Sequence, residues 1–232
     1  MRGSSRDQWS REDSVFRFPF SVFRFRLRIT DYGLREPNEV KLLFVGPPGA
    51  GKGTQASRVA RELGIPHIST GEMFRDQAAA GTELGRRVQT IMEDGEYVPD
   101  ELTVAMLEER LAEPDARAGF ILDGFPRTGG QVAALDSLIG VDGLDGVVVF
   151  EVDEEELARR LLIRARIDDT IETIKNRFRV FADQTAPLLE IYGERGLLIS
   201  IDGMGDIDEV TERILSALEA LRITDYGERT TG

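Results

Sequence analysis

The sequence predicts an α/β fold, a three-layer sandwich in which helices cover both faces of a central parallel sheet. Short apolar runs, typical of buried parallel strands, occur at 40–45, 120–122, 147–152 and 197–201. Segments with helical periodicity separate these runs, and a glycine-rich stretch joins the first strand to the first helix. Alternating strands and helices favour a parallel sheet with crossover helices.

Seven segments are expected to be helical from their apolar spacing. They span 54–63, 72–80, 84–94, 100–111, 154–164, 170–192 and 206–221. Gly64 and Pro66 end the first helix. The last helix carries one apolar face, on which Val210, Ile214 and Leu218 recur at helical spacing.

Composition excludes several classes of function. The chain has 232 residues and a net charge of −13, which disfavours binding to nucleic acid or to an anionic membrane. It contains no cysteine, so disulfides, thiolate zinc sites and cysteine nucleophiles are excluded. No apolar run is long enough to span a membrane. Its one histidine, His67, is expected to be a partly buried structural residue.

Residues 1–39 differ from the rest of the chain. They contain eight Arg, no Lys and six acidic residues, and their Phe residues alternate with Arg, Pro and Ser. No apolar core of a secretory signal is present in this segment. We expect 1–39 to be an N-terminal extension that is disordered or absent from the native protein. The alternative is a strand-forming extension that docks on the domain or on a partner.

The strongest chemical signal is GPPGAGKGT at 46–54, which follows an apolar strand and opens a helix. Its glycines allow backbone N–H groups to point inward, and the helix N-terminus and Lys52 add positive charge. This context predicts a phosphate-binding loop (P-loop) for a nucleoside triphosphate. The hydroxyl residue is Thr54, because Gly53 stands where the general pattern has Ser or Thr.

From residue 40 to about residue 221 the chain resembles adenylate kinase. Five ordered motifs carry the resemblance besides the glycine-rich loop: STGEMFR at 69–75, DGFPRTGGQ at 123–131, RLLIRAR at 160–166, DDT at 168–170 and TAPL at 185–188. The resemblance implies a P-loop sandwich over 40–221. Within it, 69–98 would be a helical insertion that binds the nucleoside monophosphate (NMP), and 163–170 a minimal lid loop. Residues 222–232 would form a C-terminal tail.

The resemblance also implies an enzyme that transfers a phosphoryl group reversibly from Mg-ATP to AMP, giving two ADP and maintaining the adenine nucleotide balance. Its partners would be ATP, AMP and ADP, with no nucleic acid and no membrane. The resembled enzymes are generally cytoplasmic monomers. Phosphoryl transfer depends mainly on positioning and on preorganised positive charge, for which Arg is well suited.

Residue roles follow from the same resemblance. The implied ATP site comprises Gly49, Ala50, Gly51, Lys52, Gly53, Thr54, Arg160 and Gly205. The implied AMP site comprises Thr70, Arg75, Glu96, Tyr97, Val98, Gly124, Phe125, Pro126, Arg127, Gln131, Arg166 and Arg177. The implied catalytic groups are Lys52, Arg127, Arg164, Arg166 and Arg177. Gln131 would read the polar edge of adenine, and Arg160 would pack over the donor adenine.

Metal use is expected to be limited to Mg²⁺ that arrives with ATP. Asp123 ends a predicted buried strand and is expected to face a metal-bound water; the alternative is a helix N-cap. Asp168 and Asp169 are expected to cap the following helix or to latch the lid. Only Ala165 separates Arg164 from Arg166, so the chain resembles the short-lid form without zinc.

Two other functions remain open at this stage. One is a kinase for another monophosphate such as UMP or CMP, although Thr128 stands where those enzymes usually have Asn. The other is a nucleotide-binding module without catalysis, which has no need of Arg side chains around the transferred group.

Overall fold

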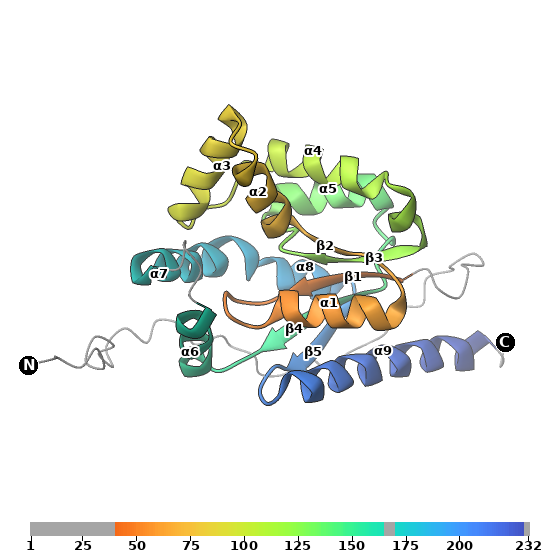
Figure 1. The fold of residues 1–232 in the computed structure, drawn as a ribbon. Coiled ribbons are helices and arrows are strands. Elements are labelled where there is room, and N and C mark those ends of the chain that lie inside the picture. The colour runs from red at the N-terminus through yellow and green to blue at the C-terminus, as the bar shows by residue number, and fades with distance from the viewer. Residues whose placement is uncertain (1–39, 165–169, 230–232) are drawn as a thin grey trace, which may run out of the picture.

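The protein was analysed as a computed structural model, which describes residues 40–164 and 170–229. Five parallel strands form one sheet in the order β2-β3-β1-β4-β5, and helices cover both of its faces (Figure 1). The strands are β1 (Val40–Val45), β2 (His67–Ser69), β3 (Gly119–Asp123), β4 (Gly146–Glu151) and β5 (Leu198–Asp202). The predicted three-layer α/β architecture is confirmed.

Two hydrophobic cores lie on opposite faces of the sheet, and β1 contributes alternate residues to each. Leu42 and Phe44 pack on one face, while Leu43 and Val45 pack on the other. Because both faces are buried there, β1 is continuously apolar from Leu42 to Val45 instead of alternating with polar residues. The first face is covered by α1 (Lys52–Leu63), α6 (Glu154–Arg164) and α9 (Ile207–Arg229). The second is covered by α4 (Asp100–Leu111), α5 (Gly129–Ile139) and α8 (Leu188–Glu194).

Helices α2 (Thr70–Ala79) and α3 (Glu83–Glu93) form a hairpin that projects beyond the sheet layers (Figure 1). We call this pair, with the linker to α4, the arm (residues 70–99). The arm has a small core of its own, in which Phe74, Val88 and Val98 are buried together. At Gly85 of α3 an added Cβ would overlap the Gln77 carbonyl of α2, so this glycine sets how closely the two helices pack.

The single helix predicted over 170–192 is wrong. The structure instead has α7 (Ile171–Val180), a π-helical segment η2 (Phe181–Thr185) and then α8. The Ala186 amide donates to the Phe181 carbonyl at 2.9 Å, a bond that spans five residues instead of four. Pro187 explains the break, because a proline has no N–H and its ring clashes with the carbonyl four residues earlier in an α-helix.

Three further elements were not predicted. Strand β2 has only three residues, too few to show a period, but it pairs with β3 through His67 opposite Ile121. Helix α5 begins with two glycines, whose low helix propensity gives no sign of a helix there. Its N-terminus is capped by the Thr128 hydroxyl. A short 3₁₀ helix, η1, spans Pro114–Ala118. Helix α9 also continues beyond its predicted end at 221, to Arg229.

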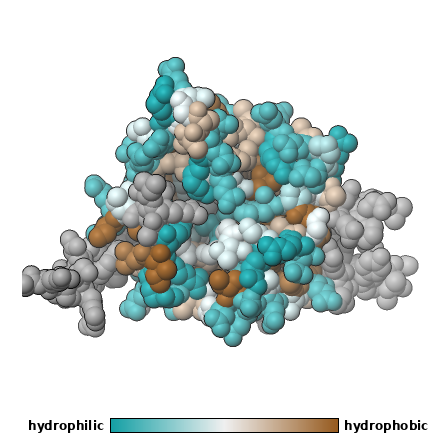
Figure 2. All heavy atoms as spheres, in the orientation of Figure 1, coloured by the Kyte–Doolittle hydropathy of each residue, from teal (hydrophilic) through white to brown (hydrophobic). Residues whose placement is uncertain are grey.

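The surface is mostly hydrophilic on the face that Figure 2 displays, as the charge content of the chain leads one to expect. Exposed apolar side chains include Leu162 and Ile163 at the end of α6. In the part of the chain that the structure describes, no helix is both long and apolar enough to cross a bilayer. The segment 1–39 lies outside the described residues.

Candidate active site

A cleft of about 900 Å³ lies at the carboxyl ends of β1 and β3. The chain runs from β1 outward to β2 and returns through β3, whereas β4 and β5 lie on the other side of β1. The strand order therefore reverses at β1, and ligands of open parallel sheets bind outside such a switch point. The cleft is lined by the loop after β1, the β3–α5 loop, the arm, α6 and α7.

The loop after β1 has the geometry of an anion cradle. Gly49 and Gly51 have φ of 85° and 90°, values that other residues rarely adopt. A Cβ at Gly49 would also lie 2.8 Å from the Leu157 carbonyl oxygen, so the loop packs tightly on α6. Helix α1 begins at Lys52, and its N-cap residue, Gly51, has no side chain to cap its first N–H groups. These N–H groups and the helix dipole are therefore available to a phosphate.

Lys52 is held at the base of this cradle. Its ammonium donates to the carbonyls of Gly46, at 2.7 Å, and Pro47, at 3.0 Å. Burial lowers the pKa of Lys52 to about 8, Asp123 opposes this shift, and the nearby charges of Arg127 and Arg164 add to it. A buried cation beside other cations favours a bound anion, which would restore the charged form.

Asp123 ends β3 beside the cradle, where its Oδ2 would lie 3.2 Å from a Cβ placed on Gly53. Burial by itself would raise the pKa of this carboxyl, but His67, Lys52 and Arg127 together hold it below its usual value. His67 Nε2 lies 3.6 Å from Asp123 Oδ2, and His67 Nδ1 pairs with the Ser57 hydroxyl at 3.0 Å. The partly buried position expected for His67 is confirmed, and the side chain lies beside the acid of the site.

The described residues contain no group of three or more His, Cys, Asp or Glu side chains that could hold a metal. A single ionised carboxylate beside a phosphate cradle fits Mg²⁺, which keeps most of its waters and takes the remaining ligands from nucleotide oxygens. It does not fit a resident zinc ion, which needs several protein ligands.

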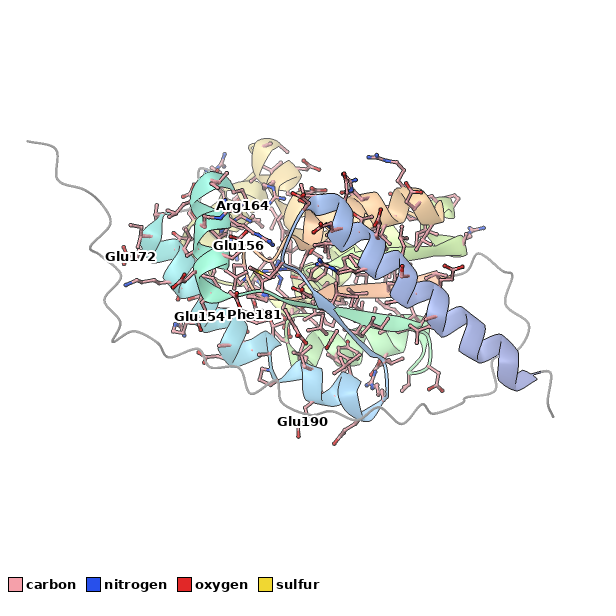
Figure 3. All side chains as sticks on the ribbon, turned by 90° about the horizontal axis from the view of Figure 1, so that it is seen from below. Glu154, Glu156, Arg164, Glu172, Phe181 and Glu190 are labelled. Atoms are coloured by element: carbon pink, nitrogen blue, oxygen red, sulfur yellow. The ribbon has the colours of Figure 1, made fainter. Side chains whose placement is uncertain are left out.

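Five of the predicted arginines line the cleft. They are Arg75 on α2, Arg127 after β3, Arg160 and Arg164 on α6, and Arg177 on α7. Figure 3 shows Arg164 on α6 together with Glu156. Four segments distant in sequence thus bring guanidinium groups to one cavity of an acidic protein. Such charge convergence is costly unless an anion binds there.

Protein atoms orient several of these guanidinium groups. Arg160 donates to Glu156 at 2.7 Å and to the Gly203 carbonyl at 2.8 Å. Arg127 donates to the Gly124 carbonyl at 2.7 Å. Arg177 donates to the Met92 carbonyl of the arm at 3.2 Å. These bonds cost the side chains rotamer freedom before any ligand arrives, and thus preorganise the site.

Three predicted residues lie outside the described part of the chain: Arg166, Asp168 and Asp169. The N-cap of α7 is Thr170, whose hydroxyl accepts from the Thr173 amide at 3.1 Å. Thr170 therefore caps the start of α7.

Most predicted ATP-site and AMP-site residues also line the cleft. The set includes the whole loop 49–54, Gly205, Glu96, Tyr97, Gly124, Phe125 and Pro126. Three residues that were predicted to contact AMP do not line the cleft: Thr70, Val98 and Gln131. Thr70 is buried and donates to the Gly124 carbonyl at 2.9 Å, while Val98 packs in the core of the arm.

Gln131 is the third, and only 2% of it is exposed. Its carbonyl oxygen accepts from the Arg127 amide at 2.8 Å, and its amide nitrogen donates to Asp100 at 2.7 Å. Both ends of the side chain thus bond to protein atoms. An adenine contact by Gln131 stays a prediction.

Sequence reasoning missed Asp100, Glu156 and Thr185 as parts of the site. Asp100 and Glu156 hold Gln131 and Arg160 in place. Thr185 lines the cleft and bonds to Arg127. For Thr185, the TAPL motif marked the position but gave no role. Glu156 lies four residues before Arg160 on α6, so the helical spacing was a local signal for this pair. For Asp100 no local signal exists, since Gln131 is brought close only by the fold.

Comparison with known proteins identifies the family of the chain. The family profile described as adenylate kinase matches residues 44–197. An adenylate kinase of Clavibacter michiganensis subsp. michiganensis is 53% identical over 184 residues, covering 77% of this chain and 92% of that protein. Another, of Thermobifida fusca, is 52% identical over 187 residues, covering 78% of this chain and 99% of that protein. The chain therefore belongs to the adenylate kinase family, and it is an enzyme that transfers a phosphoryl group between ATP and AMP to give ADP.

Proposed function

We propose that the cleft binds both nucleotides at once, with ATP phosphates in the loop 46–54 and AMP between the arm and the β3–α5 loop. The γ-phosphoryl group would then pass in line from ATP to the AMP phosphate without a phospho-enzyme. The observation that carries this arrangement is the convergence of Lys52 and five arginines on one cleft of a chain with net charge −13.

Each cation has a distinct place in this proposal. Lys52 and the α1 N-terminus hold the donor phosphates, and Arg160 lies over the donor adenine. Arg75 and Arg127, on the arm side, clamp the AMP phosphate bidentately. Arg164 and Arg177 face the transferred group from α6 and α7, joined by Arg166. Charge that develops on the equatorial oxygens would be stabilised by these preorganised groups.

Mg²⁺ would be held by the nucleotide phosphates and, through a water, by Asp123. When bound, the ion neutralises phosphate charge and orients the donor oxygens. Asp123 remains ionised for this contact because its pKa is held below the usual value.

We also propose that the enzyme acts as a cytoplasmic monomer, which light scattering and cell fractionation would test.

The acceptor can be tested directly by following ADP formation from Mg-ATP with AMP, UMP, CMP or GMP as the second substrate. We expect turnover with AMP to exceed that with each other monophosphate by at least roughly 100-fold, because a site built to hydrogen-bond one base leaves groups unpaired with another. Faster turnover with UMP or CMP would contradict the AMP site. Binding of ATP with no AMP-dependent turnover would contradict catalysis.

A further inference from the structure

Thr185 bridges two residues that line the cleft. Its hydroxyl donates to the Arg127 carbonyl at 3.0 Å and pairs with the Tyr97 hydroxyl at 2.8 Å. A threonine hydroxyl has a single proton, so donation to Arg127 means that Tyr97 donates to Thr185. Thr185 is 5% exposed, and both bonds are therefore shielded from most water.

A third contact closes this series of interactions into a ring. The Arg127 guanidinium carbon lies 4.8 Å from the centre of the Tyr97 ring, within the range of a cation–π interaction. Arg127 Nε also donates to the Gly124 carbonyl. The backbone of Arg127 is thus held by Thr185, while its side chain is held by Tyr97 and Gly124.

The ring joins three segments that are distant in sequence. Tyr97 belongs to the arm, Arg127 to the β3–α5 loop, and Thr185 ends the π-helical segment before α8. The wide turn of that segment accommodates Pro187, and Phe181 and Thr185 of the same turn both line the cleft. π-helical turns inside helices often occur at functional sites for this reason.

We propose that Thr185 and the Tyr97 hydroxyl position Arg127 for the phosphate of AMP. Thr185 acts through Arg127 and does not itself touch the transferred group, so it is a positioning residue. The inference rests on the proposed role of Arg127 as a phosphate clamp. Small displacements of a positioned group are costly in catalysis, so loss of one supporting bond reduces turnover even when the fold survives.

The test compares Thr185→Val, which removes the hydroxyl at nearly constant volume, with Thr185→Ser, which keeps it. Kinetics are measured at varied AMP with saturating Mg-ATP, and then at varied Mg-ATP with saturating AMP. For Thr185→Val we expect kcat/KM for AMP to fall roughly tenfold, about the effect of one lost hydrogen bond, with KM for ATP changed less than about twofold. Thr185→Ser should restore most of the wild-type value.

Tyr97→Phe removes the second hydroxyl but keeps the ring under Arg127. We expect a smaller loss for AMP, roughly threefold, since the bond to Arg127 itself remains. The Tyr97 hydroxyl acts through Thr185. The double variant that combines Tyr97→Phe with Thr185→Val should therefore have no lower kcat/KM for AMP than Thr185→Val alone. This variant also decides the proposal if Thr185→Val does not fold.

A matched control is Thr103→Val, which removes another buried hydroxyl that donates to backbone carbonyls but does not contact Arg127. It should leave both KM values within about twofold of wild type. The proposal is overturned if Thr185→Val matches wild type, if KM for ATP and AMP rise together, or if the two hydroxyl deletions are additive. Arg127→Met tests the role of Arg127 separately from the role of Thr185. If Arg127→Met is fully active, Arg127 does not clamp the AMP phosphate.

Discussion

Lys52 is the only lysine in the loop 46–54, and its ammonium is held at the base of the loop by the Gly46 carbonyl. We therefore expect Lys52→Met to lower kcat by roughly 100- to 1,000-fold, the usual effect of losing one preorganised transition-state charge. The fold should persist, since the variant removes a cation that is costly to bury. Steady-state kinetics and a circular dichroism melt check both statements, and full activity in a folded variant would remove Lys52 from the mechanism.

The lowered pKa of Lys52 predicts a proton linkage to ATP binding. Below pH 8 the free enzyme carries the charged ammonium, and above pH 8 it increasingly loses the proton. Bound phosphates favour the charged form and raise this pKa again. At pH 9, where the phosphates of ATP are ionised already, since the second pKa of a phosphate is about 6, binding should take up a proton.

Calorimetric titration at pH 9 in two buffers of different ionisation enthalpy measures that proton. At pH 6 the Lys52 contribution should vanish, because the ammonium is charged before binding as well as after. Lys52→Met is the control and should show no uptake from this group. Equal observed enthalpies in the two buffers for the wild type at pH 9 would contradict the linkage.

Gln131 carries the prediction on base selection. Gln131→Ala should raise KM for AMP and leave KM for ATP nearly unchanged, since it removes a group that a hydrogen-bonded base would need. Gln89→Ala is a matched control on the arm, because Gln89 is exposed and bonds to Glu93 in its own helix. An equal rise in KM for both nucleotides would show that Gln131 acts on structure through Arg127 and not on base choice.

At the scale of elements, the arm depends on the close approach of α2 and α3 at Gly85. Gly85→Ala should separate the two helices, because the added methyl group has no room beside the Gln77 backbone. We expect a rise in KM for AMP with little change for ATP, and a lower Tm. Gly129→Ala is the matched control: no atom lies within 4 Å of its added Cβ, so it should be neutral or slightly stabilising.

Elements with strong periodic patterns were predictable from the sequence, and the reasons for the others are physical. β1 is mostly apolar and is followed by the glycine loop, so its existence and its boundaries 40–45 could be predicted. β2 is too short for any period, and it exists because β3 offers it an edge to pair with. Pro187 was a signal for the break between α7 and α8, but the helical pattern around it favoured one continuous helix.

The residues of the candidate site also fall into those that the sequence could predict and those that it could not. Lys52 could be named from the glycine-rich loop and its strand–helix context, and Arg127 from the resemblance of its motif to adenylate kinase. Asp100 and Thr185 could not, because their roles depend on partners far away in the sequence that only the packed fold brings within hydrogen-bond distance.

At the scale of the whole molecule, the described sheet and cores begin at Val40, and the family profile begins at residue 44. Relatives from Clavibacter and Thermobifida align over 92% and 99% of their own lengths while covering 77% and 78% of this chain. Within the described part of the chain, residues between 40 and 221 form both cores and the cleft. Residues 1–39, in contrast, contain none of the motifs of the site.

We therefore predict that residues 40–232 fold and function without 1–39. The shortened chain should melt within about 2 °C of the full chain, which for a domain of this size corresponds to less than about 1 kcal/mol. Its AMP-dependent ADP formation should match in kcat and in both KM values. If 1–39 instead forms a strand that docks on the domain, removing it exposes the apolar surface that the strand covers, and Tm falls by several degrees. Differential scanning calorimetry and the coupled assay on the two chains decide between these outcomes, because only the docked strand predicts that stability or most of the activity is lost on truncation.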